Sequence, residues 1–466
     1  MIAKQHIYSN KLVLFLVLLV YVLLALFYIN SSHNWGGDFA LYISQAQALI
    51  TGQSTTLYEA SKLSCEASYY RMNPDLYPPG FPILLTPAVA LFGVNFWVFK
   101  CIIILCYLAT LLVVYALFKR IASNTQAIVC TALMATSTVF IQYSNYVLAD
   151  IPAMLWIMLG FYLHNKWADE NCSNSYLKQI ILATICVFAY QTKSLSIVLF
   201  LAITLHQLFI KFNQNRVKSI AVFIISFILL NAIVKLLYPH SGAGYQQQAS
   251  TITWQTIQAN LIYYSNAPKW FLYNSNLWLW LTWPMMIVGA VASFKIHRVY
   301  VFFMLMQLTA LVIWPFQEGV RFIFILIPFY FLFAMLGYNY VASKFHIQRY
   351  ALLVFLGVLM YSFYASVKLI SQPLKTDDEI TSADAQALFN FVNAHTKSTD
   401  KLIFFKPNVL RLLAQRESVY LLERNAIATS KADWWIYKHG DMPADTMGLQ
   451  PVFTNGTFTI FKLKME

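Results

Sequence analysis

The sequence predicts an α-helical polytopic membrane protein that carries a small α/β domain after its last membrane helix. Three observations lead to this fold class. Of the 466 residues, 59% are hydrophobic and only 11% are charged. Long apolar runs recur as far as about residue 370, and about 20 apolar helical residues cross a bilayer core. After Ser371-Gln372-Pro373 the composition becomes that of a soluble protein.

About eleven apolar segments are long enough to be predicted as membrane helices. We place them at residues 11–29, 95–118, 126–142, 149–165, 177–192, 194–210, 217–237, 277–294, 299–315, 320–341 and 350–370. The segment 81–93 is apolar but short and flanked by prolines, so we expect a re-entrant or interfacial helix there. The first run follows Lys4 and Lys11 without an obvious small-residue cleavage site. We therefore expect a retained helix and not a signal peptide.

The basic residues predict how the chain is oriented. Residues 1–374 hold 21 Lys and Arg against 8 acids, whereas residues 375–466 hold 11 of each. The net charge of +13 thus belongs to the membrane part, which argues against nucleic-acid binding. With the N-terminus inside, most basic residues fall in short inner loops, as the positive-inside rule requires. We predict a transmembrane domain, 1–374, with a first outer loop at 30–80, and a soluble domain, 375–466, on the outer face.

The acids of the membrane part have the opposite distribution. Six of the 8 fall at outer helix ends or in outer loops, namely Asp38, Glu59, Glu66, Asp75, Asp150 and Glu318. Ionisable residues at a membrane are costly and usually mark a functional site. We therefore expect the functional site at the outer face.

The first acid, Asp38, follows Gly36-Gly37 directly after the first apolar run. The two glycines predict a sharp turn or the close approach of a ligand. An amphipathic helix is expected to follow, with Gly52 as its C-terminal stop. Two interpretations of Asp38 stand side by side. It is either the general base of a membrane-embedded sugar transferase or the N-cap of this helix.

Two further outer segments carry acids. The segment Arg71 to Pro82 has four prolines within nine residues, which enforce a stiff, extended path. This path brings Arg71, Asp75 and Tyr77 to the start of an apolar segment. There the three residues either form part of a site or belong to a rigid turn that has no chemical role. Asp150 stands at a predicted helix start with Pro152 in the first turn, where it would also serve as a cap.

Two basic residues are candidates for binding a lipid phosphate. Lys193 lies between two apolar runs, so it either snorkels to the headgroups or contacts a lipid phosphate. Arg321 follows Gly319-Val320 at the outer end of a very apolar helix. A guanidinium at this position can donate two parallel hydrogen bonds to the oxygens of one phosphate group.

Residues 375–466 predict the α/β domain. We expect helices at 384–392 and 409–414 and strands at 401–405 and 418–422. Asn455-Gly456 between alternating residues predicts a hairpin with a type I′ turn. The six cysteines have no paired spacing, so we expect neither a disulfide framework nor a zinc site. No glycine-rich phosphate loop is evident, so we expect no nucleotide cofactor. A metal between Asp38 and Asp150 is possible from the residues alone.

The order of the motifs resembles a known superfamily. Gly36-Gly37-Asp38, Tyr77-Pro78-Pro79-Gly80, Leu148-Ala149-Asp150-Ile151-Pro152 and Gly319-Val320-Arg321-Phe322 before a proline-containing helix occur in this sequence. This order is similar to that of the GT-C membrane glycosyltransferases, which include the protein O-mannosyltransferases and the lipid A aminoarabinose transferases. The resemblance is to the broad bacterial branch and covers most of residues 11–345. This branch does not generally need a metal, so the resemblance implies no metal and no cofactor.

The resemblance implies roles for named residues. Asp38 would be the catalytic aspartate of the first outer loop, and Asp150 a second catalytic acid facing the same cavity. Arg321, Lys193 and then Arg71 would hold the donor phosphate, and the substrate cavity would include Tyr42, Asp75, Tyr77 and Glu318. Two departures bear on the acceptor. Phe39 follows Asp38 where protein mannosyltransferases have a glutamate, and Tyr77 precedes the paired prolines where aminoarabinose transferases have a lysine.

The function that the resemblance implies is inverting transfer of a sugar from a polyprenyl-phosphate carrier to a lipid, glycan or protein acceptor. The expected location is a bacterial inner membrane, with the site facing the periplasm. Two other functions stay open. A flippase for a lipid-linked sugar is expected to show an inverted repeat, and none is evident. A polysaccharide ligase or polymerase would use a large mid-chain outer loop, yet loop 238–276 has only Lys269 as a fixed charge.

Overall fold

The computed structural model describes residues 2–68, 77–169, 175–209, 214–238, 252–317, 319–346, 348–372, 379–440 and 448–463. The chain forms two compact units. The first, here called the helical unit, comprises residues 1–29, 100–237 and 246–373. The second, here called the loop–sheet unit, comprises residues 30–99, 238–245 and 374–466. The predicted domain boundary at 374/375 lies outside the described residues.

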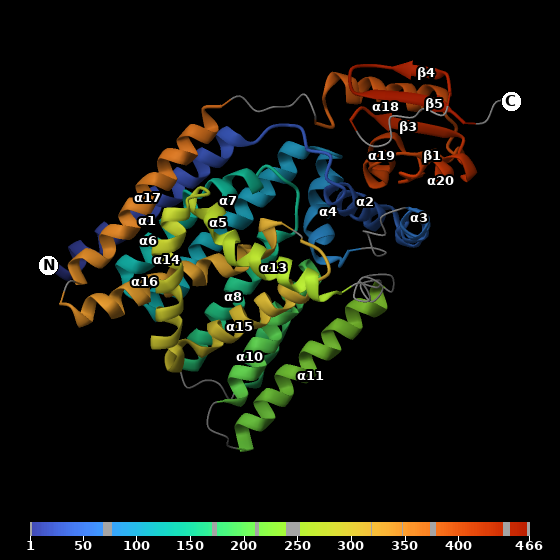
Figure 1. Ribbon diagram of the computed structural model, residues 1–466. Helices are drawn as coiled ribbons and strands as arrows, with labels where there is room; N and C mark the ends of the chain where they lie inside the picture. Colours follow the sequence, from blue (N-terminus) through green and yellow to red (C-terminus); the bar gives the residue numbers. More distant parts are fainter. Residues whose placement is uncertain are drawn as a thin grey trace. The chain divides into compact units, whose positions relative to one another are not determined.

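Apolar helices build the helical unit. They are α1 (Ile2–Tyr28), α5 (Phe96–Ile121), α6 (Asn124–Ala135), α7 (Thr138–Tyr143), α8 (Asp150–Asp169), α9 (Tyr176–Thr192), η2 (Ser194–Ser196), α10 (Ile197–Leu208), α11 (Gln214–Leu237), α13 (Trp254–Asn266), η3 (Ala267–Leu272), α14 (Asn276–Ala292), α15 (Phe294–Ile313), η4 (Val320–Leu326), α16 (Ile327–Lys344) and α17 (Gln348–Ile370). Helices α1 and α17 pack side by side, although they lie near opposite ends of the sequence (Figure 1).

These helices make the protein an integral multi-pass membrane protein. Within the described residues, 6 helices are long and apolar enough to cross a bilayer, or 7 if the pair bent by 114° between Trp254–Leu272 and Asn276–Ala292 counts as one span. The expected count of about eleven is therefore not confirmed. Most of the remaining predicted segments are helical but short or interrupted, whereas α8 has 20 residues and is not among the six. Helix α9 has 17 residues, and the segment 126–142 is divided between α6 and α7.

The break between α6 and α7 is stabilised by side chains of α17. Helix α6 ends at Ala135, and the carbonyl oxygen of Thr136 accepts hydrogen bonds from Ser362 Oγ at 2.8 Å and Ser366 Oγ at 2.5 Å. Backbone groups at membrane depth must find partners within the protein. Hydroxyl groups of a neighbouring helix thus allow an interrupted span without a proline.

Helices α14 and α16 cross at two glycines. A Cβ atom on Gly289 would overlap the carbonyl oxygen of Phe333, and one on Gly337 would overlap that of Met285. Small residues at a helix crossing let the backbones approach closely, which membrane helices use in place of hydrophobic association. This crossing therefore requires glycine on both helices.

The loop–sheet unit combines three helices after α1 with the C-terminal domain. Its elements are α2 (Asp38–Thr51), α3 (Ser54–Ala67), α4 (Gly80–Phe92), α18 (Ala383–His395), β1 (Leu402–Ile403), α19 (Pro407–Ala414), β2 (Ser418–Val419), α20 (Arg424–Thr429), β3 (Trp434–Lys438), β4 (Pro451–Thr454) and β5 (Phe458–Lys462). The strand order is β2-β1-β3-β5-β4, with β1 parallel to β2 and β3 and with β5 antiparallel to β3 and β4. The predicted α/β class of this domain is confirmed.

The hairpin between β4 and β5 is present, but its predicted turn type is wrong. Neither Asn455 nor Gly456 has the positive φ that a type I′ turn requires. Instead, Asn455 Oδ1 accepts hydrogen bonds from the backbone N–H groups of Thr457 at 3.0 Å and Phe458 at 2.8 Å. A Cβ atom on Gly456 would lie 2.7 Å from Asp384 Oδ2, so a larger residue there would displace that carboxylate.

Candidate functional site

The first group of predicted site residues surrounds Asp38 at the start of α2. The helix begins at Asp38 itself, and Gly37 has the cap position with φ −81°. The half-buried Asp38 Oδ1 accepts a hydrogen bond of 2.8 Å from Tyr77 Oη. Neither Gly36 nor Gly37 has a positive φ, so the chain does not use the left-handed conformation that glycine allows there. A Cβ atom on Gly37 would meet nothing within 4 Å, so the space next to Asp38 is open.

Contacts of both its ring and its backbone carbonyl group fix the position of Tyr77. Its ring centroid lies 4.9 Å from that of Tyr42, which in turn packs edge-on against Phe81 at 4.9 Å. Gln45 Nε2 donates a hydrogen bond of 2.7 Å to the Tyr77 carbonyl oxygen. The structure thus brings together three of the predicted residues, Asp38, Tyr42 and Tyr77. The other two from this segment, Arg71 and Asp75, lie outside the described residues.

The segment that precedes Asp38 is anchored in the C-terminal domain. The buried Trp35 ring has centroid distances of 5.2 to 6.0 Å to four rings, those of Phe389, Phe404, Phe405 and Phe458. His33 stacks on Phe39 at 3.9 Å, and its carbonyl oxygen accepts a hydrogen bond of 3.0 Å from Ile380 N. The C-terminal domain therefore fixes the chain that leads into Asp38, which the sequence did not predict.

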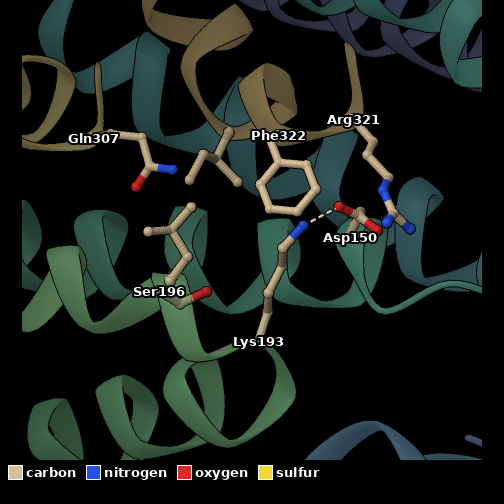
Figure 2. A pocket seen from close by; sticks show the side chains of 8 residues that line it. Asp150, Lys193, Ser196, Gln307, Arg321 and Phe322 are labelled. Atoms are coloured by element: carbon tan, nitrogen blue, oxygen red, sulfur yellow. Dashed lines mark hydrogen bonds and ion pairs between the residues drawn. The ribbon is translucent and has the colours of Figure 1, made fainter. Parts of the chain in front are cut away.

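The second group of predicted site residues lies in the helical unit. Asp150 is the first residue of α8 and is only 5% exposed. Lys193 lies in extended conformation between α9 and η2, and its side chain is 20% exposed. The two form an ion pair, drawn as a dashed line in Figure 2. The predicted acid and one predicted cation thus pair across 43 residues of sequence.

Arg321 reaches the same place from η4. Gly319, two residues earlier, has φ 84° and ψ −179°, a conformation that is essentially restricted to glycine. The Phe322 ring centroid lies 3.8 Å from Lys193 Nζ and 5.3 Å from Arg321 Cζ. Figure 2 shows the small pocket that is lined by Asp150, Lys193, Leu195, Ser196, Gln307, Arg321, Phe322 and Ile325. Glu318 lies outside the described residues.

This pocket is suited to an anion. Two cationic side chains and one carboxylate line it, so its charge is positive on balance. An ion pair that is removed from water is weak evidence for stability, because desolvation offsets the attraction. A membrane protein that retains such charges usually uses them for a ligand. Among the described residues, no group of three or more His, Cys, Asp or Glu side chains is placed to hold a metal ion.

Two buried polar residues of the helical unit were missed by sequence reasoning. Lys100 is fully buried, and its Nζ donates a hydrogen bond of 2.6 Å to Asn145 Oδ1 in the loop that leads into α8. Gln307 is fully buried in α15 and lines the pocket. The available signal was a single polar residue within an apolar run. It does not reveal which helix the residue faces.

Residues 77–239 match the family described as dolichyl-phosphate-mannose-protein mannosyltransferase, and this range contains Tyr77, Asp150 and Lys193. No curated protein sequence matches the chain significantly.

Solved structures match nearly the whole chain. ArnT from Cupriavidus metallidurans in the apo state is 11% identical with a TM-score of 0.60, covering 100% of this chain and 99% of that one. The same protein bound to undecaprenyl phosphate is 10% identical with a TM-score of 0.59, covering 97% and 98%. The archaeal oligosaccharyltransferase AglB from Archaeoglobus fulgidus, in complex with an inhibitory peptide and a dolichol-phosphate, is 12% identical with a TM-score of 0.57, covering 92% and 69%. The predicted resemblance to the GT-C superfamily is confirmed at the level of the fold.

Proposed function

We propose that the protein is an inverting glycosyltransferase that moves a sugar from a polyprenyl-phosphate carrier to an acceptor hydroxyl. One observation carries the proposal: Lys193 and Arg321, from separate segments of the chain, line one pocket with the buried Asp150. A carrier phosphate at the end of a lipid tail needs fixed cations within the protein. Two proteins of this fold were solved with undecaprenyl phosphate and dolichol-phosphate, which supports this class of donor.

On the donor side, Arg321 and Lys193 bind the phosphate oxygens. A guanidinium forms two parallel hydrogen bonds to such oxygens, whereas an ammonium acts as a point charge. Asp150 holds Lys193 in place through their ion pair, so we assign it a positioning role in preference to the expected role of second catalytic acid. Arg71 is a further candidate for the phosphate, and Glu318 for the substrate cavity.

On the acceptor side, Asp38 is the general base. Its carboxylate takes the proton of the attacking acceptor group. The acceptor atom forms a bond to the anomeric carbon as the bond from that carbon to the phosphate oxygen breaks. The electron pair of the broken bond passes to the phosphate, which leaves with the lipid, and a single displacement inverts the anomeric centre. Tyr77 orients the carboxylate, and Tyr42 packs against Tyr77. Asp75 is a further cavity candidate.

The positive-inside rule supports placing the reaction on the outer face of the membrane, facing the periplasm if the chain is a bacterial inner-membrane protein. The acceptor is a lipid, a glycan or a protein. Phe39 and Tyr77 stand where two types of GT-C enzyme have other residues, so neither protein mannosylation nor aminoarabinose transfer to lipid A is favoured.

The proposal is tested by comparing the wild type with Asp38→Asn in membranes at equal expression. Each receives radiolabelled polyprenyl-phosphate sugars and a total cell-envelope extract as acceptor. Glu59→Gln is the matched control, since Glu59 is an exposed acid of α3 in the same unit. We expect transfer by the wild type and the control, and none by Asp38→Asn.

Other outcomes separate the alternatives. Transfer that survives in Asp38→Asn would reduce Asp38 to a structural residue of the helix start. Label that crosses the bilayer without transfer would indicate a flippase. Label that accumulates in long polymeric chains would indicate a ligase or polymerase.

A further inference from the structure

Gln307 is a buried amide that the proposed mechanism does not use. It lies in α15 within the apolar run Met304-Leu305-Met306-Gln307-Leu308 and has 0% exposure. Neither Oε1 nor Nε2 has a hydrogen-bond partner among the described residues. Since both atoms are unpaired, this holds whichever way the amide is turned. Buried polar groups are nearly always paired, so an orphaned amide requires an explanation.

The position of Gln307 supplies that explanation. Its side chain lines the pocket that also contains Lys193 and Arg321. In Figure 2, Phe322 and Lys193 lie between Gln307 and Arg321. An apolar side chain would fill the same place in the span without leaving two polar atoms unsatisfied. The pocket therefore presents both a charged end for an anion and an uncharged amide.

The amide adds a chemical requirement that the two cations do not. Lysine and arginine only donate hydrogen bonds, and ionised phosphate oxygens only accept them. A phosphate would thus satisfy Nε2 but leave Oε1 without a donor. A hydroxyl group both donates and accepts, so it satisfies an amide in either orientation. A ligand that satisfies the two cations and both amide atoms together carries such a group beyond its phosphate.

We infer that Gln307 hydrogen-bonds a hydroxyl group of the carried sugar and so helps to determine which sugar the enzyme accepts. The inference rests on the proposed function, because it takes the phosphate of the donor to lie between Lys193 and Arg321. The sugar is the part of such a donor that carries hydroxyl groups, whereas the polyprenyl chain is apolar. Gln307 is thus a specificity-determining residue for the sugar, whereas Lys193 and Arg321 bind the phosphate of the carrier.

The test compares the binding of the carrier without a sugar with the binding of the carrier that is linked to a sugar. Wild type, Gln307→Met and Gln307→Leu are purified in lipid nanodiscs. Binding is measured for undecaprenyl phosphate and for undecaprenyl-phosphate-linked mannose, glucose, galactose and aminoarabinose. Gln258→Met is the matched control, because Gln258 is an exposed residue of α13 outside the pocket. The unfolding temperature of each ligand-free protein is recorded in parallel.

We expect both Gln307 variants to bind undecaprenyl phosphate as the wild type does. Their affinity for the sugar-charged carrier that the wild type prefers should fall by about tenfold, the effect of one lost hydrogen bond to a buried polar group. Their ligand-free unfolding temperature should equal or exceed that of the wild type, because an orphaned amide has been removed. The control should match the wild type in all three measurements.

Three results would overturn the inference. Equal affinity of the wild type and the variants for the sugar-linked carrier would mean that the amide binds only water. A lowered unfolding temperature together with weaker binding of both ligands would make Gln307 a structural residue. Failure of the wild type to bind either ligand would overturn the proposed function as well, a pattern distinct from the other two.

Discussion

Tyr77 Oη donates a hydrogen bond of 2.8 Å to Asp38 Oδ1, although 39 residues separate the two in sequence. A hydrogen bond to a charged group contributes more than one between neutral groups. We expect Tyr77→Phe to lower sugar transfer by about tenfold, since the carboxylate loses the group that orients it. The ring contact with Tyr42 is retained in this variant, so the unfolding temperature should change little.

The measurement is the initial rate of label transfer in membranes, with Tyr437→Phe as the control. Tyr437 is a half-buried tyrosine of β3 in the same unit. A Tyr77→Phe enzyme as fast as the wild type would show that the hydrogen bond to Asp38 has no part in the reaction.

The ion pair between Asp150 and Lys193 predicts a double-mutant cycle. Removing one member of this partly buried pair leaves the other charge uncompensated in a poorly solvated site, which is destabilising. We expect Asp150→Asn and Lys193→Met each to lower the unfolding temperature, and the double variant to be more stable than either single one. Transfer should stay low in all three, because the phosphate has lost an ordered cation. Transfer restored in the double variant would exclude Lys193 from donor binding.

What the sequence predicted well depends on local signals. Asp38 was placed at a helix start because glycines and an apolar pattern surround it, and Gly52, with φ 71°, ends that helix as expected. Helices α18 and α19, strands β1 and β2 and the last hairpin also follow from turn residues and alternating patterns, which act over a few positions, whereas α20 and β3 were not predicted. Such signals do not depend on which distant segment the chain meets.

What the sequence did not predict depends on contacts between distant segments. The interruption after α6 is stabilised by serine hydroxyls of α17 and carries no proline or glycine signal. The predicted type I′ turn does not form, because the Asn455 side chain accepts a hydrogen bond from the backbone N–H group of Thr457. Lys100 and Gln307 stand alone in apolar runs, and periodicity does not reveal which partner each side chain faces.

Two glycines should respond differently to replacement by alanine. Gly319 has φ 84° and ψ −179°, so Gly319→Ala forces this segment out of its conformation and displaces Arg321. We expect a weaker affinity for undecaprenyl phosphate, by about tenfold or more. Gly37 has φ −81° and open space around its Cα atom. Gly37→Ala should therefore leave the unfolding temperature and carrier binding unchanged.

Both glycine variants are measured by carrier binding in nanodiscs and by label transfer. The Gly37→Ala methyl group occupies the open space beside Asp38, so we expect it to slow transfer without affecting the carrier. Normal carrier binding by Gly319→Ala would show that the Arg321 segment tolerates the new backbone conformation or that Arg321 does not hold the phosphate.

Trp35 tests whether the C-terminal domain supports the reaction. Its ring is 7% exposed and lies among four phenylalanine rings of that domain. Truncating such a buried aromatic residue costs about 3 to 5 kcal/mol. Trp35→Ala should thus loosen the segment that leads into Asp38 and lower transfer, whereas Trp35→Phe should retain most of both stability and activity. Trp280→Ala is the control, because Trp280 is 73% exposed on an apolar helix. If Trp35→Ala lost stability yet transferred sugar at the wild-type rate, the aromatic anchor would be needed for folding and not for placing Asp38.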